Sequence, residues 1–250
     1  MRERQTPGLQ WYSLKTQNLF NSVQSVNWLE IDLKKRTVDL LYDKDSLRTT
    51  SAFAKSNNAL AAINAGFFNM KQGGSVTFLK KDGAVIAKNQ ADLKDKNSVV
   101  IRGSFVVFQD GNVQIQSPKE EEVYAKEASI DDVLLSGPLL IEYNDPIALD
   151  ETPFHQKRHP RSCACLNNKG RLLLLTVDGR SEKAEGMSLP ELTEFLEFLN
   201  CDFAINLDGG GSTTLYLKGK AYSGVINYPS DNRTFDHQGQ RKVANVIVVH

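Results

Sequence analysis

The sequence predicts an α+β fold, a sheet-dominated single domain in which a mixed β-sheet packs against a few helices. Three observations support this class: short apolar or alternating runs recur along the chain, tight-turn signals such as Asp82-Gly83 separate them, and few segments have helical spacing. With 250 residues, 40% of them hydrophobic and 24% charged, the chain can bury a large core. We expect one domain over residues 1–250, with residues 1–25 as an N-terminal extension.

Polar loops connect the expected strands. The runs that fit strands are residues 26–33, 37–42, 59–64, 75–79, 84–87, 98–101, 105–109, 113–116, 132–136, 139–143, 161–167, 171–178, 204–207, 214–217 and 243–250. The first two of these runs flank Lys34-Lys35-Arg36 and are expected to form a hairpin. Long polar loops are expected at residues 87–96, 118–127 and 144–159.

Two segments are predicted to be helical. The first begins at Ser188, which together with Glu191 has the pattern of a capping box. The apolar residues that then share one helix face are Leu189, Leu192, Phe195, Leu196 and Leu199. This helix connects two expected strands, and if those strands are parallel, Asp178 and Asp208 lie at the same sheet edge. A weaker helix is expected within residues 47–58.

Charge and hydropathy exclude several classes of function. Thirty basic residues balance thirty acidic ones, and no basic cluster alternates with aromatic residues, so the sequence predicts no nucleic-acid partner. The longest apolar runs, such as residues 172–177, are too short to span a bilayer, and residues 1–7 carry no hydrophobic export signal. We therefore expect a soluble chain without a membrane-spanning segment.

Three cysteines, Cys163, Cys165 and Cys201, give an odd count. A large domain does not need a disulfide framework, so buried thiols are the favoured interpretation, with one bridge plus one free thiol as the alternative. Cys163 and Cys165 are two apart and share one strand face. Because no further cysteine or suitably placed histidine completes a set of ligands, the cysteines predict no metal site.

The strongest functional signal is the glycine corner, which we define as residues 208–213. Asp208 ends an apolar run and is followed by Gly209, Gly210 and Gly211, then by Ser212 and Thr213. Glycines permit close ligand approach, and successive N–H groups can face an anion, while the carboxylate suits an electron-poor carbon or a cation. The pattern favours chemistry beside a phosphate. The alternative is a plain hairpin turn that Asp208 caps.

Other polar residues have both a functional and a structural interpretation. Arg158 and Arg161 could bind phosphate or form surface ion pairs, and Asp178 could be catalytic or end a turn in which Arg180 pairs with it. The histidines His155 and His159 are four apart, but prolines at 153 and 160 bracket them and no Glu follows His155. We predict no metal and no cofactor, and expect His159 to donate a hydrogen bond near Arg158.

The order of the motifs resembles that of the phosphodiester glycosidases over most of the chain from about residue 27. The matching segments are Asn64-Ala65-Gly66-Phe67-Phe68, Ser136-Gly137-Pro138-Leu139-Leu140, Arg158-His159-Pro160-Arg161-Ser162, Val177-Asp178-Gly179-Arg180, the stretch from Gly186 to Leu192, the stretch from Asn206 to Ser212, and Arg241-Lys242-Val243-Ala244-Asn245. One departure is residues 162–165, where relatives usually have Thr-Ala followed by an aliphatic residue and glycine.

The resemblance implies a hydrolase that separates an N-acetylglucosamine-like sugar from a phosphodiester. It implies Asp208 as the first and Asp178 as the second candidate catalytic carboxylate. The substrate-binding candidates are Asn64, Gly66, Phe67, Arg158, His159, Arg161, Arg180, Gly209, Gly210, Gly211, Ser212, Thr213 and Arg241. At most one of Phe67 and Phe68 is expected to face ligand, because aromatic residues are more often core. Bacterial relatives further imply an extracytoplasmic enzyme of envelope or exopolysaccharide glycans.

The chemistry is consistent with this resemblance. A phosphodiester is a far less basic leaving group than an alkoxide, so one essential carboxylate can suffice where ordinary glycosidases need two. Two alternatives remain: a carbohydrate or glycan-phosphate binding protein without turnover, and a serine hydrolase that uses Ser212. The second has little support, because the chain has no Gly-x-Ser-x-Gly elbow.

Overall fold

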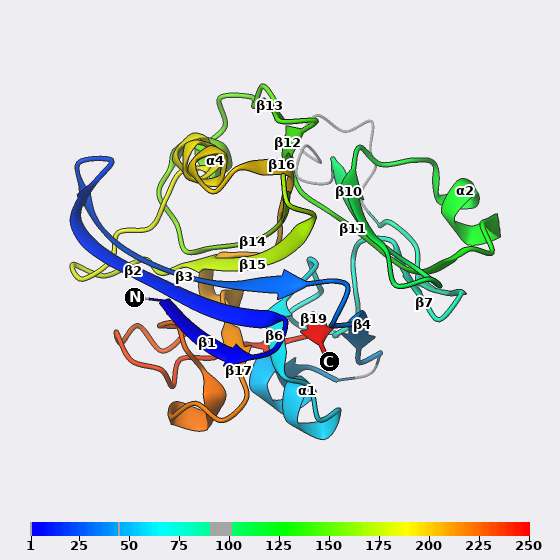
Figure 1. Cartoon of the computed structure of the whole chain (residues 1–250), viewed down its shortest axis with the longest axis horizontal. Helices are drawn as coiled ribbons and strands as arrows, with labels where there is room; N and C mark the ends of the chain where they lie inside the picture. The colour runs from blue at the N-terminus through cyan, green and yellow to red at the C-terminus, as the bar shows by residue number, and fades with distance from the viewer. Residues whose placement is uncertain (1, 45, 91–101) are drawn as a thin grey trace.

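The computed structural model describes residues 2–44, 46–90 and 102–250 (Figure 1). Its strands are β1 (Arg2–Thr6), β2 (Leu9–Leu19), β3 (Ser22–Asp32), β4 (Val38–Tyr42), β5 (Arg48–Thr49), β6 (Ala61–Asn64), β7 (Leu79–Lys81), β8 (Ala84–Ala87), β9 (Gly103–Phe108), β10 (Val113–Gln116), β11 (Ile130–Ser136), β12 (Leu139–Glu142), β13 (Asp145–Pro146), β14 (Arg161–Asn167), β15 (Arg171–Val177), β16 (Cys201–Asn206), β17 (Leu215–Leu217), β18 (Lys242–Val243) and β19 (Asn245–Val249). Its α-helices are α1 (Thr50–Ser56), α2 (Glu121–Lys126), α3 (Pro153–Gln156) and α4 (Leu189–Phe198). The predicted sheet-dominated α+β class is confirmed.

The described strands form four sheets. The largest has the order β1-β2-β3-β15-β14-β16-β12-β13, and the others are β10-β9-β11-β7-β8, β17-β6-β19-β4 and β18-β5. The expected mixed sheet is corrected, because every ladder among the described strands is antiparallel. Strands β15 and β16 do run in the same direction, but β14 lies between them and is antiparallel to both.

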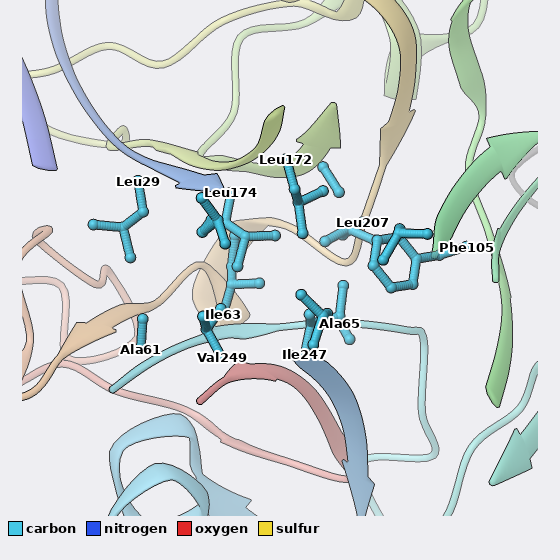
Figure 2. Close-up of a cluster of buried hydrophobic side chains, with 14 of the residues drawn as sticks. Leu29, Ala61, Ile63, Ala65, Phe105, Leu172, Leu174, Leu207, Ile247 and Val249 are labelled. Carbon is cyan, nitrogen blue, oxygen red and sulfur yellow. The ribbon is translucent and has the colours of Figure 1, made fainter. Parts of the chain in front are cut away.

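The sheets and helices stack in layers (Figure 1). Strand β15 is buried on both faces, which explains its continuous apolar sequence. Leu172 and Leu174 belong to the core between the eight-stranded and four-stranded sheets, where Ile63 and Ile247 meet them (Figure 2). Leu173 belongs to a second cluster beneath α4. A third cluster joins α1 to the outer face of the four-stranded sheet. Among the described residues, none of the helices combines the length and the hydropathy that a membrane span requires.

The two predicted helices are confirmed, and the capping box is present at α4. The Ser188 hydroxyl accepts from the Glu191 N–H, and the Glu191 carboxylate accepts from the Ser188 N–H at 2.9 Å. Pro190 lies in the first turn, where its missing N–H costs nothing. The apolar face of α4 then packs on the eight-stranded sheet, with Leu192 and Leu196 fully buried.

Several expectations are corrected. The hairpin between β3 and β4 does not form, because β3 pairs with β2 and β15 while β4 pairs with β19 in another sheet. Residues 2–25 supply β1, β2 and the start of β3. Helices α2 and α3 occupy parts of the stretches expected to be polar loops at residues 118–127 and 144–159. The strand expected at residues 98–101 lies outside the described residues.

Cys165 and Cys201 form a disulfide with a Cα–Cα distance of 5.9 Å, so the favoured interpretation of three buried thiols is corrected in favour of its alternative. Cys163 remains a free, buried thiol. Cys165 lies on β14 and Cys201 begins β16, and these two strands are neighbours in the eight-stranded sheet. Their adjacency depends on β14 entering between β15 and β16, which local sequence patterns do not encode.

Candidate active site

The glycine corner follows directly from β16. Because β15 and β16 are both antiparallel to β14, Asp178 and Asp208 leave the sheet at the same edge. Pro160, just before β14, lies between them. A Cβ at Gly179 would lie 2.9 Å from the Pro160 nitrogen, and a Cβ at Gly209 would lie 2.7 Å from the Pro160 carbonyl oxygen. The expected shared edge is therefore present, although the strands are not adjacent.

Asn64 at the end of β6 holds the corner in place. Its side-chain NH₂ donates to the Asp208 carbonyl, and its Oδ1 accepts from the Ser162 hydroxyl at 2.7 Å and the Thr214 N–H at 3.0 Å. The side chain is fully buried, so Asn64 joins three strands rather than lining a sugar pocket as predicted. A satisfied buried amide of this kind fixes the Asp208 backbone.

Asp208 is a half-buried residue at the start of the corner. Burial raises the pKa of Asp208 to about 6, against the opposing effects of the Ser212 hydroxyl, the positive charge of Arg241 and the Gly209 N–H. A carboxylate with this pKa is mostly ionised at neutral pH. It can therefore face a developing positive charge or direct a water molecule.

Two guanidinium groups converge on the corner. A Cβ at Gly210 would lie 2.9 Å from Nη2 of Arg180, and one at Gly211 would overlap the guanidinium of Arg241. Arg180 is exposed and forms no ion pair with a described residue, whereas Arg241 donates to Asp231 Oδ1 from Nε at 2.9 Å. The two arginines thus bring positive charge to the corner, and the charge of Arg241 acts on the Asp208 carboxylate.

Three backbone N–H groups of the corner donate to carbonyls of the protein, whereas the sequence predicted that they face an anion. The Gly210 N–H donates to the Pro160 carbonyl at 2.8 Å. The Ser212 N–H donates to the Gly209 carbonyl at 3.1 Å, and the Thr213 N–H donates to the Gly210 carbonyl at 3.3 Å. Residues 210–212 thereby form one turn of 3-10 helix. Of the glycines of the corner, Gly209 is required for close packing against backbone, and the N–H groups of Gly210, Ser212 and Thr213 donate within the protein rather than forming the expected cradle around an anion.

Asp178 is fully buried and serves a neighbouring loop. Its carboxylate accepts from the Ser25 hydroxyl at 2.7 Å, the Asn227 NH₂ at 3.1 Å and the Tyr228 N–H at 2.7 Å. Burial raises the pKa of Asp178 to about 6 despite these three donors. Asn227 also donates to the Thr213 carbonyl at 3.1 Å, so Asp178 is connected to the corner through one side chain. Arg180 does not pair with it.

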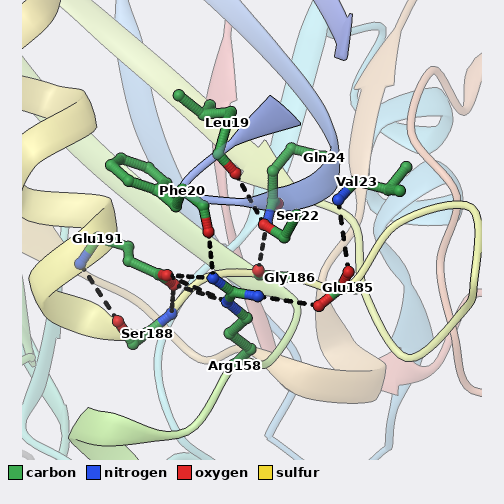
Figure 3. A network of polar contacts seen from close by, with 10 residues as sticks. All are labelled: Leu19, Phe20, Ser22, Val23, Gln24, Arg158, Glu185, Gly186, Ser188 and Glu191. Atoms are coloured by element: carbon green, nitrogen blue, oxygen red, sulfur yellow. Dashed lines mark hydrogen bonds and ion pairs between the residues drawn. The ribbon is translucent and has the colours of Figure 1, made fainter. Parts of the chain in front are cut away.

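Arg158 belongs to a structural network rather than to the corner (Figure 3). Its guanidinium donates to the Glu191 carboxylate at 2.6 Å, to Glu185 at 2.9 Å and to the Phe20 carbonyl at 2.6 Å. These contacts join the start of α4 to the β2–β3 turn. The predicted phosphate-binding role is not supported, because the described contacts of Arg158 are with these groups.

Arg161 is also corrected, because its side chain is 1% exposed. Its guanidinium donates to the carbonyls of Met187 at 2.9 Å, Phe154 at 2.8 Å and Lys157 at 2.9 Å. Burial lowers the pKa of Arg161 to about 10, so the group stays charged at neutral pH. It fastens the segment before β14 instead of reaching a ligand.

The remaining predicted site residues differ in their burial. Gly66 is buried, donates its N–H to Asn245 Oδ1 and has Leu134 against its Cα, so no ligand can reach it. Phe68 packs on the α1 cluster, whereas Phe67 is half-buried outside it. Helix α3 ends before His159, which lies half-buried with its pKa lowered by burial and by the charges of Arg161 and Arg180.

The hydroxyls of the corner are buried. Ser212 has no exposed surface, which argues against a serine nucleophile. The hydroxyls of Thr213 and Thr214 are buried and have no hydrogen-bond partner among the described residues. Buried polar atoms normally find a partner in protein or ordered water, so these two mark where water or ligand can complete the corner.

A cavity of about 350 Å³ adjoins the corner through Arg180, and none of residues 208–213 lines it. Its lining residues are Gly179, Arg180, Ser181, Glu182, Lys183, Tyr228, Ser230, Arg233, Thr234 and Phe235. Sequence reasoning missed the contribution of residues 227–235, including Asn227 and Tyr228. The available signal is loop length, because the 24 residues between β17 and β18 lack strand patterns and loops this long are commonly functional.

One group of carboxylates among the described residues has metal-like spacing. Asp39, Asp82 and Asp132 place oxygens within 4.8 Å of one another. The Lys81 ammonium lies among them, 2.5 Å from Asp39, 2.6 Å from Asp82 and 3.5 Å from Asp132, and the pKa of Lys81 is raised by these partners against the opposing effect of burial. The lysine therefore already supplies the cation at this cluster. The cluster contains no residue of the glycine corner.

Comparisons with known proteins agree with this architecture. The catalytic domain of zebrafish N-acetylglucosamine-1-phosphodiester alpha-N-acetylglucosaminidase, auto-inhibited by its pro-peptide, superposes with a TM-score of 0.78 and 21% identity, covering 98% of this chain and 84% of that one. A hypothetical protein from Synechocystis superposes with a TM-score of 0.70 and 15% identity, covering 98% and 62%. At these identities, the two structures establish the fold.

Sequence comparison extends the relationship. Bovine N-acetylglucosamine-1-phosphodiester alpha-N-acetylglucosaminidase is 30% identical over 219 residues, covering 81% of this chain and 39% of the bovine protein. The SPbeta prophage-derived uncharacterized protein YomE of Bacillus subtilis is 26% identical over 229 residues, covering 80% and 33%. The chain thus spans about two fifths of the length of the bovine relative. The family model described as phosphodiester glycosidase matches residues 57–250, and the chain belongs to the phosphodiester glycosidase family.

Proposed function

We propose that this chain hydrolyses the bond between the anomeric carbon of a sugar and a phosphodiester. The observation that carries the proposal is the convergence of Arg180 and Arg241 on the glycine corner that also bears Asp208. Guanidinium groups match phosphate oxygens with paired hydrogen bonds and retain their charge at all physiological pH values. Membership of the family supports the same reaction.

In this proposal the charged groups divide the work. Arg180 and Arg241 bind the phosphate and stabilise the negative charge that grows on it as the glycosidic bond breaks. The Asp208 carboxylate stabilises the oxocarbenium-like anomeric carbon or directs water to it. Because the phosphate is a weakly basic leaving group, the mechanism needs no general acid.

The reaction consumes one water molecule. The bond between the anomeric carbon and the phosphate oxygen breaks, and its electron pair stays with the phosphate. The water oxygen forms the new bond to the anomeric carbon, and the proton that it loses goes to the departing phosphate or to solvent. The products are the free sugar and a phosphomonoester, which balances the atoms and charges of the diester plus water.

Other residues act by positioning. Asp231 holds the Arg241 guanidinium, Asn64 holds the Asp208 backbone, and Asp178 holds the loop that carries Tyr228. The cavity of about 350 Å³ beside Arg180 falls within the roughly 300–1,000 Å³ of small-molecule sites, and we assign it to the substrate. His159 and Phe67 remain proposed substrate contacts.

We further propose that the sugar is N-acetylglucosamine-like, that the natural substrate is a phosphodiester of envelope or exopolysaccharide glycans, and that the protein acts outside the cytoplasm of a bacterium. The names of the mammalian relatives support the sugar. The Cys165–Cys201 disulfide supports the location, because such bonds persist in oxidising compartments.

The test is an assay with N-acetylglucosamine α-1-phosphate methyl diester. We expect equal amounts of free sugar and methyl phosphate, and loss of both products in Asp208→Asn. Arg180→Gln and Arg241→Gln are expected to lower kcat/KM by at least about 100-fold each, the scale of losing one stabilising group. Arg158→Gln is the matched control, because its contacts lie in the α4 network and its folded fraction should retain kcat/KM.

An intact diester across several sugars would overturn the catalytic proposal. If calorimetry then showed binding of the same diester without product, the alternative of a glycan-phosphate binding protein would replace it. Unchanged turnover in both Arg180→Gln and Arg241→Gln would refute the assigned phosphate site even if hydrolysis occurred.

A further inference from the structure

A second cavity, of about 490 Å³, shares Tyr228 with the cavity beside the glycine corner. Its lining residues are Trp11, Ser13, Lys15, Asn27, Ile226, Tyr228 and His237, and we call it the Trp11 cleft. Trp11 and Lys15 come from β2 and Asn27 from β3, so the N-terminal strands build one wall. The long loop after β17 builds the other.

The loop wall contains a column of stacked rings. Tyr222 stacks on His237 at 4.4 Å between centroids, His237 packs on Tyr228 at 4.2 Å, and Tyr228 stacks on Phe235 at 4.1 Å. Phe235 and Tyr228 line the first cavity, and Tyr228 and His237 line the Trp11 cleft. The column therefore forms a partition between the two cavities, and its inner rings offer a ligand their edges and polar atoms.

The cleft is rich in hydrogen-bond donors. The Lys15 ammonium donates to the Tyr228 hydroxyl at 2.7 Å and lies 4.5 Å from the ring centroid. Asn27 is 1% exposed and its Oδ1 accepts from the Trp11 indole N–H at 3.2 Å, which fixes the direction of the amide. The Asn27 NH₂ is buried and has no hydrogen-bond partner among the described residues. Among the residues that the structure describes, no Asp or Glu lines the cleft.

This donor set identifies the kind of ligand. A buried NH₂ group without an acceptor needs an oxygen atom, and an ammonium without a carboxylate partner in the cleft favours an anion. Trp11 and Ile226 supply apolar surface, which suits the C–H groups of a pyranose. A neutral sugar would use the apolar surface but would make no charge-assisted contact with the exposed Lys15 ammonium, whose positive charge also acts on the buried Asp178 carboxylate.

We propose that the Trp11 cleft binds an anionic sugar unit, a pyranose that carries a phosphate or carboxylate, on the same glycan whose phosphodiester lies at the glycine corner. The placement of the anionic sugar on the same glycan as the phosphodiester rests on the proposed hydrolase activity, whereas the binding of the anionic sugar does not. The cleft makes the enzyme selective for charged glycans, with Lys15 and Asn27 contacting the acidic sugar and Trp11 packing against its ring.

The first experiment measures binding without turnover. Glucose 6-phosphate, glucuronate and glucose are titrated into the full chain, followed by calorimetry and by the NMR signals of the His237 ring. We expect at least one anionic sugar to bind about tenfold more tightly than glucose and to shift the His237 signals. Preference for glucose 6-phosphate assigns a phosphorylated unit, and preference for glucuronate a carboxylated one.

Variants connect this binding to the cleft. Lys15→Gln and Trp11→Ala are expected to weaken the anionic sugar about tenfold, whereas Lys169→Gln, an exposed lysine in the β14–β15 turn, should leave the affinity unchanged. Equal affinity for glucose and both anions, or anionic binding that does not shift His237, would overturn the proposal. If Trp11→Ala does not fold, Lys15→Gln alone decides.

The second experiment uses hydrolysis. The diester whose aglycone is the preferred anionic sugar, linked through a hydroxyl, is compared with the methyl diester. We expect Lys15→Gln to lower kcat/KM about tenfold for the first substrate and to leave the methyl diester unchanged. Equal effects on both substrates would refute the subsite. If neither diester is hydrolysed, the proposed reaction fails while the binding experiment still tests the cleft.

Discussion

Asp208 and Asp178 show how surroundings separate two residues of the same type. Burial raises the pKa of each to about 6, yet Asp208 is half-buried at the corner while Asp178 is fully buried among three donors. The difference in exposed surface between the two residues is the reason that the proposed catalytic role is given to Asp208 and the positioning role to Asp178.

The first prediction concerns the pH dependence of turnover. Because Asp208 must be ionised to act, and its pKa is raised to about 6, we expect kcat/KM to be constant above pH 7 and to fall about tenfold per pH unit below pH 6. The measurement is a pH profile of methyl diester hydrolysis between pH 4 and 8. Asp178→Asn should keep this acid limb, and a limb that disappears in that variant would assign it to Asp178.

The second prediction concerns Asp178 and stability. Its pKa is raised from 3.8 to about 6, so the folded state binds the proton more tightly, and stability is lost as pH rises from about 4 to 6. A shift of this size corresponds to roughly 3 kcal/mol. Asp178→Asn removes the charge, while Ser25 can turn its hydroxyl to accept from the new NH₂ group. Urea unfolding should therefore show the variant gaining on wild type by up to roughly 3 kcal/mol between pH 4 and 7.

Asp178→Ala is the contrasting variant in that experiment. It leaves Ser25, Asn227 and Tyr228 as buried donors without their acceptor, at roughly 1–3 kcal/mol for each unpaired group. We expect Asp178→Ala to be less stable than wild type at both pH 4 and pH 7. A constant free-energy difference between wild type and Asp178→Asn over this pH range would contradict the assigned pKa.

Arginine is the residue type for which sequence alone gave the least reliable guidance. Arg158, Arg161, Arg180 and Arg241 all lie in family motifs, but only the last two reach the corner. Each arginine carries five donors, and tertiary contacts decide whether carboxylates, carbonyls or a ligand receive them. Neighbours in sequence do not reveal that Met187, 26 residues away, accepts from Arg161.

At the scale of elements, the turn of 3-10 helix at residues 210–212 separates two kinds of glycine. A Cβ at Gly209 would meet the Pro160 carbonyl at 2.7 Å, which is backbone and cannot move cheaply. A Cβ at Gly211 would instead meet the ends of the Arg241 and Asp231 side chains. Gly209 is therefore needed for the fold and Gly211 for the position of a guanidinium.

The third prediction uses this contrast. We expect Gly211→Ala to unfold within about 1 kcal/mol of wild type but to lose at least about tenfold in kcat/KM, because Arg241 is displaced. Gly209→Ala should lower the free energy of unfolding by about 1–3 kcal/mol, the cost of forcing backbone apart. Urea unfolding and the diester assay measure both variants. Equal loss of stability in the two would remove the distinction.

Local patterns predicted elements better than their partners. The Ser188 capping box and the apolar face behind it are complete within about twelve residues, and α4 begins where they indicate. Strand β14 coincides with the predicted residues 161–167. The β3–β4 hairpin was wrong because both strands exist but belong to different sheets. Strand β2 was missed because its partly exposed, mixed sequence lacks a clear apolar period.

At the scale of the whole molecule, the layers bring distant segments to one edge. Asp178 contacts Ser25, 153 residues away, and Tyr228, 50 residues away. The sequence predicted the shared edge of Asp178 and Asp208 from the direction of two strands. The sequence could not predict that the loop at residues 227–235 lies at this edge. The loop has no periodicity, and its position depends on the Asp178 carboxylate and on ring stacking.

The last prediction concerns the Cys165–Cys201 disulfide, which closes a loop containing β15 and α4. With 36 residues of sequence separation, closing this loop in the unfolded chain gives about 4 kcal/mol of stability in the chain-entropy model. We therefore expect dithiothreitol, or the double change Cys165→Ala and Cys201→Ala, to lower Tm by about 8–16 °C. Cys163→Ala is the control, because it removes a buried thiol from the same strand while leaving the disulfide intact, so its Tm should still fall on reduction by about as much as that of wild type. Identical melting with and without reductant, in protein whose thiol count shows that the bond was formed, would mean that α4 and β15 are held by packing alone.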